Sequence, residues 1–83
     1  MKQSIIGKKS FDFAIKVVKI YSLLKKQNEF VISKQLLKSG TSIGANVKEA
    51  SAAESKKDFI HKMSIASKEA RETLYWFKTF ERK

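Results

Sequence analysis

The sequence has no cysteine and no proline, and only three of its 83 residues are glycine. Without cysteine there is no disulfide, no thiolate nucleophile and no cysteine-ligated metal, and such a composition fits a reducing cytoplasm. The lack of proline and the scarcity of glycine favour helices. No run of 18 apolar residues could cross a membrane, and residues 1–9 lack the apolar segment of a secretory signal. We therefore expect one small, cytoplasmic, helical domain.

Acidic residues are also scarce, because 8 Asp and Glu face 18 Lys and Arg, which leaves a net charge of +10. Such an excess favours a polyanionic partner, namely nucleic acid, an anionic membrane or an acidic protein. Lysine-rich usage also arises from AT-rich coding DNA, so genome composition is an alternative origin for part of the charge. A single core of this size supplies only about 3–5 kcal/mol. Oligomerisation would add the missing burial, and we expect a homo-oligomer.

The apolar pattern predicts an all-α, up-and-down helical bundle with helices over 10–27, 34–50 and 56–82. In the first helix we expect Ser10 as the N-cap and Asn28 as the stop. Its polar residues form one narrow stripe on an otherwise apolar helix, so this helix should bury more than one face. The stripe consists of Asp12, Lys16, Lys19 and Ser22.

The second helix should begin after Ser33 as N-cap. An alternative is that residues 39–44 form a loop, but the apolar period runs through them and favours a continuous helix. Its small residues, Gly40, Ser42, Gly44 and Ala45, would allow a neighbouring backbone to approach closely.

A capping box from Ser55 to Asp58 should open the third helix. We expect its core stripe to be Phe59, Met63, Ala66, Ala70, Leu74 or Thr73, Phe77 and Phe80.

No motif for catalysis or cofactor binding stands out. His61 is the only histidine and has no metal-ligand partners at suitable spacing. Glu69 and Glu72 lie beside cations and are typical of a solvated helix face. No serine has a histidine and an aspartate at an activating spacing, and no glycine-rich phosphate loop occurs. We expect no enzyme activity, no metal and no cofactor.

The charge should gather at the two ends of the bundle. One end would hold Lys56 and Lys57 at a helix start, where cations oppose the helix dipole and a bound phosphate would relieve the conflict; solvated lysines are the alternative. The other end is the better candidate for a polyanion site, because seven cations face Glu29 and Glu81. These cations are Lys25, Lys26, Lys34, Lys38, Lys78, Arg82 and Lys83. No interleaved base-stacking aromatic residues flank Lys25, Lys26, Lys34 and Lys38, so we expect no base readout.

Two long runs resemble the 23S rRNA intervening-sequence protein family, also called four-helix-bundle protein. They are SKQLLKSGTSIGANVKEA over residues 33–50 and SKKDFIHKMSIASKEARETLYW over residues 55–76; residues 11–21 fit as well. The family signature Ser-Ile-x-Ala-Asn-x-x-Glu maps to Ser42, Ile43, Ala45, Asn46 and Glu49. Spacing alone favours an ordinary helix surface for Asn46 and Glu49, whereas the resemblance implies structural or interface roles for them.

The resemblance implies a bacterial four-helix bundle that forms homopentamers with a central channel. Related accessory proteins of diversity-generating retroelements bind nucleic acid and a reverse transcriptase through such a pentamer. The resemblance also implies a fourth helix beyond the equivalent of Lys83, which this sequence does not contain. We interpret the chain as a truncated gene product, a recombinant fragment or the ordered part of a longer protein.

Two functions follow. The first is a non-enzymatic oligomer that binds RNA or DNA through a ring of lysines: Lys25, Lys26, Lys34 and Lys38, with Lys56 and Lys57 as further candidates. The second is a protein-interaction scaffold, such as a reverse-transcriptase accessory subunit, whose apolar face around Tyr75 and Trp76 docks a partner. A peripheral membrane helix is disfavoured because the lysines are spread over both ends.

Overall fold

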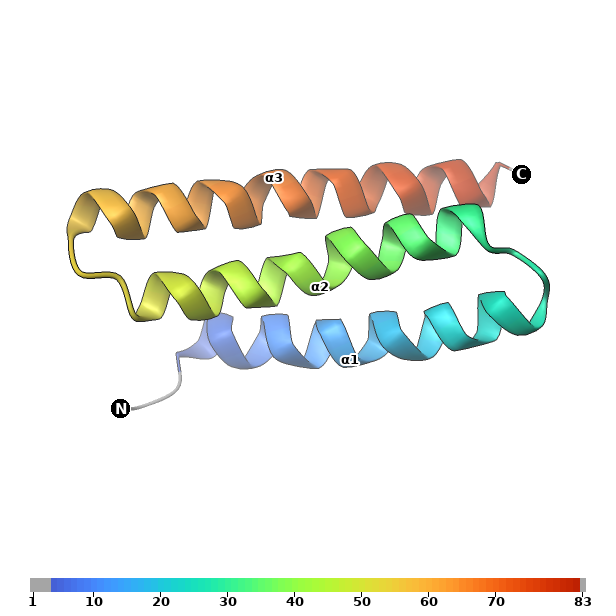
Figure 1. Cartoon of the computed structure of the whole chain (residues 1–83), viewed down its shortest axis with the longest axis horizontal. Helices are drawn as coiled ribbons and strands as arrows, with labels where there is room; N and C mark the ends of the chain where they lie inside the picture. Colours follow the sequence, from blue (N-terminus) through green and yellow to red (C-terminus); the bar gives the residue numbers. More distant parts are fainter. Residues whose placement is uncertain (1–3, 83) are drawn as a thin grey trace.

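The computed structural model describes residues 4–82 as three helices: α1 (Ile5–Lys26), α2 (Val31–Ser51) and α3 (Lys56–Glu81). They run up, down and up, as predicted, and lie side by side with α2 in the middle (Figure 1). Helices α1 and α3 both pack against α2 and not against each other. The result is a thin layer whose Cα extents are 43 × 21 × 15 Å. None of the helices described is long and apolar enough to cross a membrane.

Helix α1 starts five residues earlier than predicted. The hydroxyl oxygen of Ser4 accepts a hydrogen bond from the Gly7 N–H (2.9 Å) and caps the helix. Ser10, which we expected to be the cap, lies inside the helix, is buried and donates back to the Gly7 carbonyl (3.1 Å). The predicted stop is confirmed, because Asn28 has a φ of 63° just after the helix ends.

Helix α2 is capped differently from the prediction. The Glu29 carboxylate accepts a hydrogen bond from the Ile32 N–H (2.8 Å) and takes the role expected of Ser33. Ser33 is instead fully buried within the first turn, where it donates to the Phe30 carbonyl (3.1 Å). The continuity of the helix is confirmed, since residues 39–44 are helical throughout.

Close contact between α1 and α2 depends on two glycines. Val17, which is 1% exposed, covers Gly40, and a Cβ added at Gly40 would meet the Val17 methyl groups at 2.7 and 2.9 Å. One turn on, a Cβ at Gly44 would lie 3.2 Å from the Ser10 carbonyl oxygen. The two helices therefore approach more closely than side chains larger than hydrogen would allow, as the small residues predicted.

Helix α3 packs on α2 through a partly polar seam. The Thr73 hydroxyl lies within hydrogen-bond distance of Ser39 Oγ (2.9 Å) and of the Glu69 carbonyl (2.8 Å), and Thr73 and Ser39 are both buried. The Ser55 hydroxyl oxygen accepts from the Asp58 N–H (3.0 Å), which confirms the predicted cap.

The predicted core stripe of α3 needs one correction. Ala66 and Thr73 are buried, but Phe59 is 45% and Leu74 54% exposed. Ala70 is exposed as well. Successive residues are turned by about 100° around the helix axis, which places these three residues to one side of the helix face that packs on α2. Of the two residues predicted for the same core position, Leu74 or Thr73, it is Thr73 that occupies it. The three exposed residues belong to what we call the open face, the side of the layer where Ile6, Phe13 and Ile20 of α1 also lie.

Candidate nucleic-acid interface

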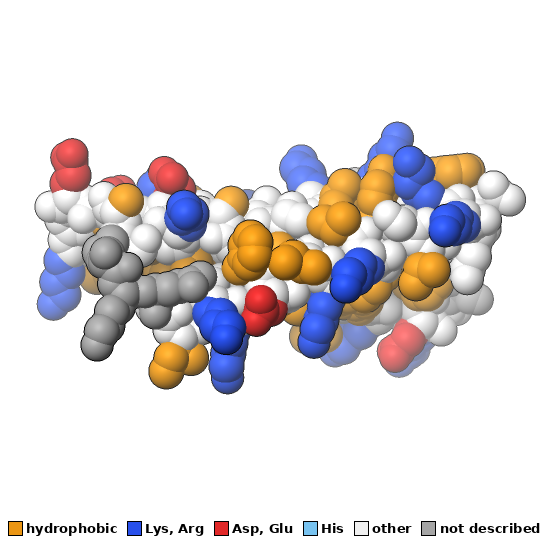
Figure 2. All heavy atoms as spheres, turned by 90° about the horizontal axis from the view of Figure 1, so that it is seen from below, with side chains coloured by type: hydrophobic (Ala, Val, Ile, Leu, Met, Phe, Trp, Pro, Cys, Tyr) orange, Lys and Arg blue, Asp and Glu red, His pale blue; other side chains and the backbone are white. Residues whose placement is uncertain are grey.

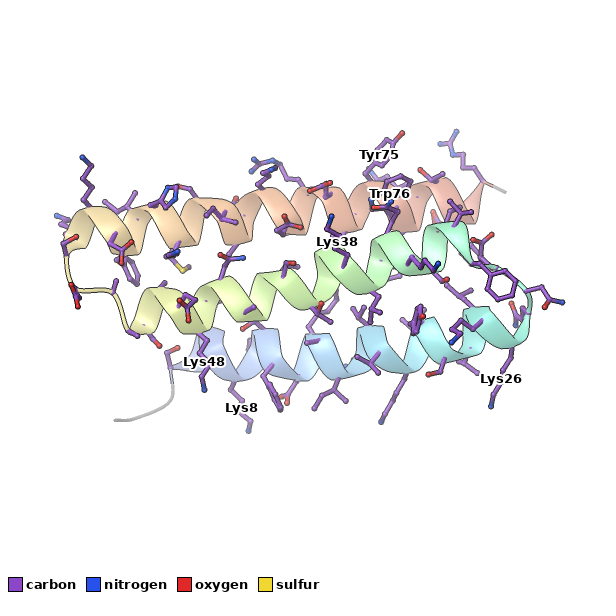
Figure 3. The ribbon with its side chains drawn as sticks, in the orientation of Figure 1. Lys8, Lys26, Lys38, Lys48, Tyr75 and Trp76 are labelled. Carbon is purple, nitrogen blue, oxygen red and sulfur yellow. The ribbon has the colours of Figure 1, made fainter. Side chains whose placement is uncertain are left out.

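The side of the layer opposite the open face carries exposed lysines along the central helix. Lys34, Lys38 and Lys48 are all exposed, and the helical register puts them on the same side of α2. Lys34 and Lys48 lie 14 positions apart, or about 21 Å along the helix. Figure 3 shows Lys38 and Lys48 projecting from α2 at different levels along its length. We call this side the lysine face.

Helix α1 adds cations to this region. Lys25 lies on the lysine face by register, while Lys26 points away from α2 near the end of α1 (Figure 3). Seen from the α1 side, Lys and Arg side chains surround the exposed hydrophobic ones, and acidic side chains are more sparsely placed (Figure 2). Lys25, Lys34 and Lys38 thus share one face at one end of the molecule, whereas Lys26 lies at its edge.

Lys56 and Lys57 are not part of this group. They open α3, at the end of the molecule where α1 starts and α2 finishes (Figure 1). The long dimension of the layer separates them from Lys25 and Lys26, because α1 ends at the opposite side. The six lysines singled out from the sequence therefore form two separate groups. Lys83, also counted there, lies outside the described residues.

A tyrosine lies within the first group, although we expected no aromatic residue there. Lys25 Nζ lies 5.2 Å from the centroid of the Tyr21 ring. Together with Ser22 and Lys26, these residues line a shallow hollow of about 350 Å³. The four-residue spacing of Tyr21 and Lys25 was the signal in the sequence, because such residues are neighbours on a helix.

The signature residues have mixed environments. Asn46 is half-buried and its side-chain amide donates to the Ser42 carbonyl (2.8 Å), while the Ser42 hydroxyl donates to the Lys38 carbonyl (2.7 Å). Both side chains thus bond to their own helix. Glu49 is exposed. Gly40 and Gly44 have the clearest structural role, since they set the distance between α1 and α2.

Tyr75 and Trp76 lie next to each other on α3. Tyr75 is 62% exposed and points away from α2, and its ring meets that of Trp76 edge-on with centroids 5.1 Å apart (Figure 3). The indole N–H of Trp76 is buried, and no acceptor within residues 4–82 bonds to it. A buried donor without a partner costs about 1–3 kcal/mol.

A second hollow, which sequence reasoning missed, lies where the start of α1 meets the end of α2. This α1/α2 groove has a volume of about 930 Å³, and small residues such as Gly7, Ala14 and Ala45 form much of its lining. Phe11, which is 60% exposed, is one of its lining residues. Lys48 and Glu49 are its charged lining residues, so the groove is locally neutral.

Among residues 4–82, no three His, Cys, Asp or Glu side chains come together where a metal ion could bind. The hollows are lined by apolar, small and lysine side chains with a single carboxylate, that of Glu49. The described surface presents a line of exposed lysines on the lysine face and exposed apolar side chains on both faces.

Comparison with known proteins finds one family. A family model described as 23S rRNA-intervening sequence protein matches residues 2–83. Among solved structures, a protein of unknown function from the S23 ribosomal protein family of Bacteroides thetaiotaomicron VPI-5482 is 52% identical. It superimposes with a TM-score of 0.90 over 94% of this chain and 73% of its own. No curated protein matches the sequence.

Proposed function

Because the chain belongs to the 23S rRNA-intervening sequence protein family, we propose that it is a non-enzymatic helical protein that binds RNA or DNA as an oligomer. The observation that carries this proposal is the lysine face. Its cations are exposed, lie on one side of the layer and extend along the central helix, so that several phosphates of one strand can be neutralised together.

Binding of this kind depends on the phosphate backbone. Lysine ammonium groups are point charges that neutralise phosphates and release counterions, so affinity falls steeply as salt rises. Phosphate contacts carry no sequence information. The lysine face therefore supports sequence-tolerant binding that is strong at low ionic strength.

Oligomerisation is supported by apolar surface on both sides of the layer. The fourth helix that the family resemblance implies would cover the open face, where Phe59 and Leu74 are exposed. It would leave the α1/α2 groove and Phe11 uncovered on the other side. That groove lies at the Lys48 end of the lysine face and is lined by both Lys48 and Glu49, so a second copy bound there would leave Lys25, Lys34 and Lys38, at the other end of the face, open to phosphates. Homopentamers, as the resemblance implies, would multiply the lysine faces.

The test is a charge reversal on the lysine face. Lys25→Glu combined with Lys38→Glu should weaken RNA binding at low salt by at least tenfold, because two phosphate contacts become repulsive. Lys16→Glu combined with Lys68→Glu is the matched control, since it changes net charge equally at exposed positions outside that face. Equal losses in both variants would reject a localised site, and no loss in either would reject nucleic-acid binding through these lysines.

A protein-interaction scaffold is the second candidate, favoured by Trp76. Its buried indole N–H, beside the exposed Tyr75, has no acceptor within residues 4–82, and a partner that turns the indole outward and supplies a carbonyl would satisfy it. A reverse-transcriptase subunit is the kind of partner that the family resemblance implies. Trp76→Ala should abolish capture of that partner from host lysate, whereas unchanged capture would exclude docking through this face.

A further inference from the structure

Tyr21 lies in a surface hollow beside two lysines, a position suited to contact with a nucleobase. It is half-buried, so its side chain is partly held in place while the rest of it remains accessible. It lines the hollow of about 350 Å³ with Ser22 and two lysines, Lys25 and Lys26. A flat aromatic ring beside two cations is the combination by which proteins hold unpaired bases and their phosphates.

We propose that Tyr21 stacks on an unpaired nucleobase while Lys25 and Lys26 hold the adjacent phosphates. This inference rests on the proposed nucleic-acid binding and adds to it the class of ligand, which is a single strand, and the residue that selects it. Single-stranded RNA and single-stranded DNA share this chemistry, because every base has a stacking face.

In the free protein the Lys25 ammonium group lies over the Tyr21 ring, and a bound nucleobase could replace it there. Lys25 Nζ lies 5.2 Å from the ring centroid, and a cation–π contact at an exposed site is weak. A phosphate forms a charge-assisted hydrogen bond with the same ammonium group. When a strand binds, the Lys25 side chain can turn towards a phosphate. The face of the Tyr21 ring is then free to stack on the adjacent base.

This arrangement discriminates against duplexes. In a double helix the bases are stacked on one another and paired, so they cannot reach a tyrosine at the surface without being unpaired. The lysines still contact duplex phosphates. We therefore expect duplexes to bind through charge alone and single strands to bind through charge and stacking.

The chain has a matched control in its other tyrosine. Tyr75 also lies on a helix and is 62% exposed, but its ring meets Trp76 edge-on. Arg71, one turn before it, donates instead to the Ser67 hydroxyl oxygen (3.0 Å). If any exposed tyrosine on a basic protein sufficed, both residues would contribute equally.

The experiment measures binding by fluorescence anisotropy at one fixed low salt concentration. The probes are a single-stranded oligoadenylate of about 12 nucleotides, which one binding domain can cover, an abasic strand of equal length and a duplex of equal length. The variants are Tyr21→Leu, Tyr21→Phe and Tyr75→Leu, each checked for helicity by circular dichroism. Carbon-13-labelled tyrosine allows the two rings to be observed separately by NMR.

Tyr21→Leu should bind the oligoadenylate about 5- to 150-fold more weakly than the wild type, while its affinity for the abasic strand and the duplex stays unchanged. Tyr21→Phe and Tyr75→Leu should retain wild-type affinity. In the wild type, oligoadenylate should shift the Tyr21 ring signals upfield and leave those of Tyr75 in place.

Wild-type affinity of Tyr21→Leu for the oligoadenylate would overturn the stacking site and leave the proposed function standing. Equal losses on all three probes, or a loss in Tyr75→Leu, would overturn the stacking site in the same way. If Tyr21→Leu fails to fold, the NMR experiment on the wild type decides. Tyr21 ring signals that do not move when oligoadenylate binds would overturn the stacking site. Failure of the wild type to bind any probe would overturn both proposals.

Discussion

Substituting Gly40 by alanine tests the closest contact in the structure. The added Cβ would lie 2.7 and 2.9 Å from the methyl carbons of Val17, a residue that is 1% exposed. Overpacking of this kind costs about 1–3 kcal/mol, whereas replacing glycine by alanine inside a helix returns about 1 kcal/mol. We expect Gly40→Ala to lower the free energy of unfolding by about 0–2 kcal/mol.

Removing the obstructing methyl groups should reverse that sign. Val17→Ala alone should cost about 2 kcal/mol through lost burial and a cavity. In the Val17→Ala background, Gly40→Ala should raise stability by up to about 1 kcal/mol, since helix propensity improves and only the Cβ of residue 17, 3.3 Å away, still lies near the new methyl group. The two substitutions should therefore show a coupling energy of about 1–3 kcal/mol in a double-mutant cycle.

Urea unfolding followed by circular dichroism at 222 nm gives the four free energies of this cycle. Protein concentration must be the same throughout, because an oligomer gains stability with concentration. Gly44→Ala serves for comparison and should have a smaller effect, as its Cβ would lie 3.2 Å from the Ser10 carbonyl oxygen. If the two substitutions had additive effects on the free energy of unfolding, or if Gly40→Ala alone raised it, α1 and α2 would not approach as closely as in the structure.

Three further predictions concern caps and buried polar groups. Ser55→Ala should lower the free energy of unfolding by about 1 kcal/mol, because the Asp58 N–H loses its acceptor; urea unfolding that matches the wild type would contradict this. Thr73→Val should cost about 1 kcal/mol by removing a buried hydrogen bond to Ser39, and a chemical-denaturation midpoint at or above the wild-type value would count against it. Trp76→Phe should keep the packing of α3 and relieve the unpaired indole N–H, so the free protein should be as stable as the wild type or more stable; a clear loss of stability would indicate that the indole N–H has an acceptor.

Periodicity was sufficient for the course of the helices, and caps were the weaker signal. The apolar period through residues 39–44 correctly outweighed the serine and glycine residues that resemble a loop. Ser10 and Ser33 have the residue type of an N-cap, yet both lie inside helices and bond back to carbonyls. Ser and Thr form either bond, so the residue type alone does not place a helix start.

The surface was partly predictable for a similar reason. Exposure of Lys34 and Lys38 follows from helical register, but Lys48, which extends the lysine face, was missed because the charges were sorted by helix end and not by helix side. The pairing of Tyr21 with Lys25 was encoded in their spacing. The α1/α2 groove depends on how closely two helices approach, which only the packed structure shows.

The most direct test of nucleic-acid binding by an oligomer is RNA affinity as a function of salt, with light scattering on the same sample. Lys25, Lys26, Lys34 and Lys38 would give a slope of about −3 per chain for a single strand in a plot of log affinity against log salt. We predict sub-micromolar binding at low salt, that negative slope, and one discrete oligomer mass. A discrete oligomer that does not bind RNA at low salt would contradict nucleic-acid binding. Genome composition would then be the better explanation for the net charge of +10.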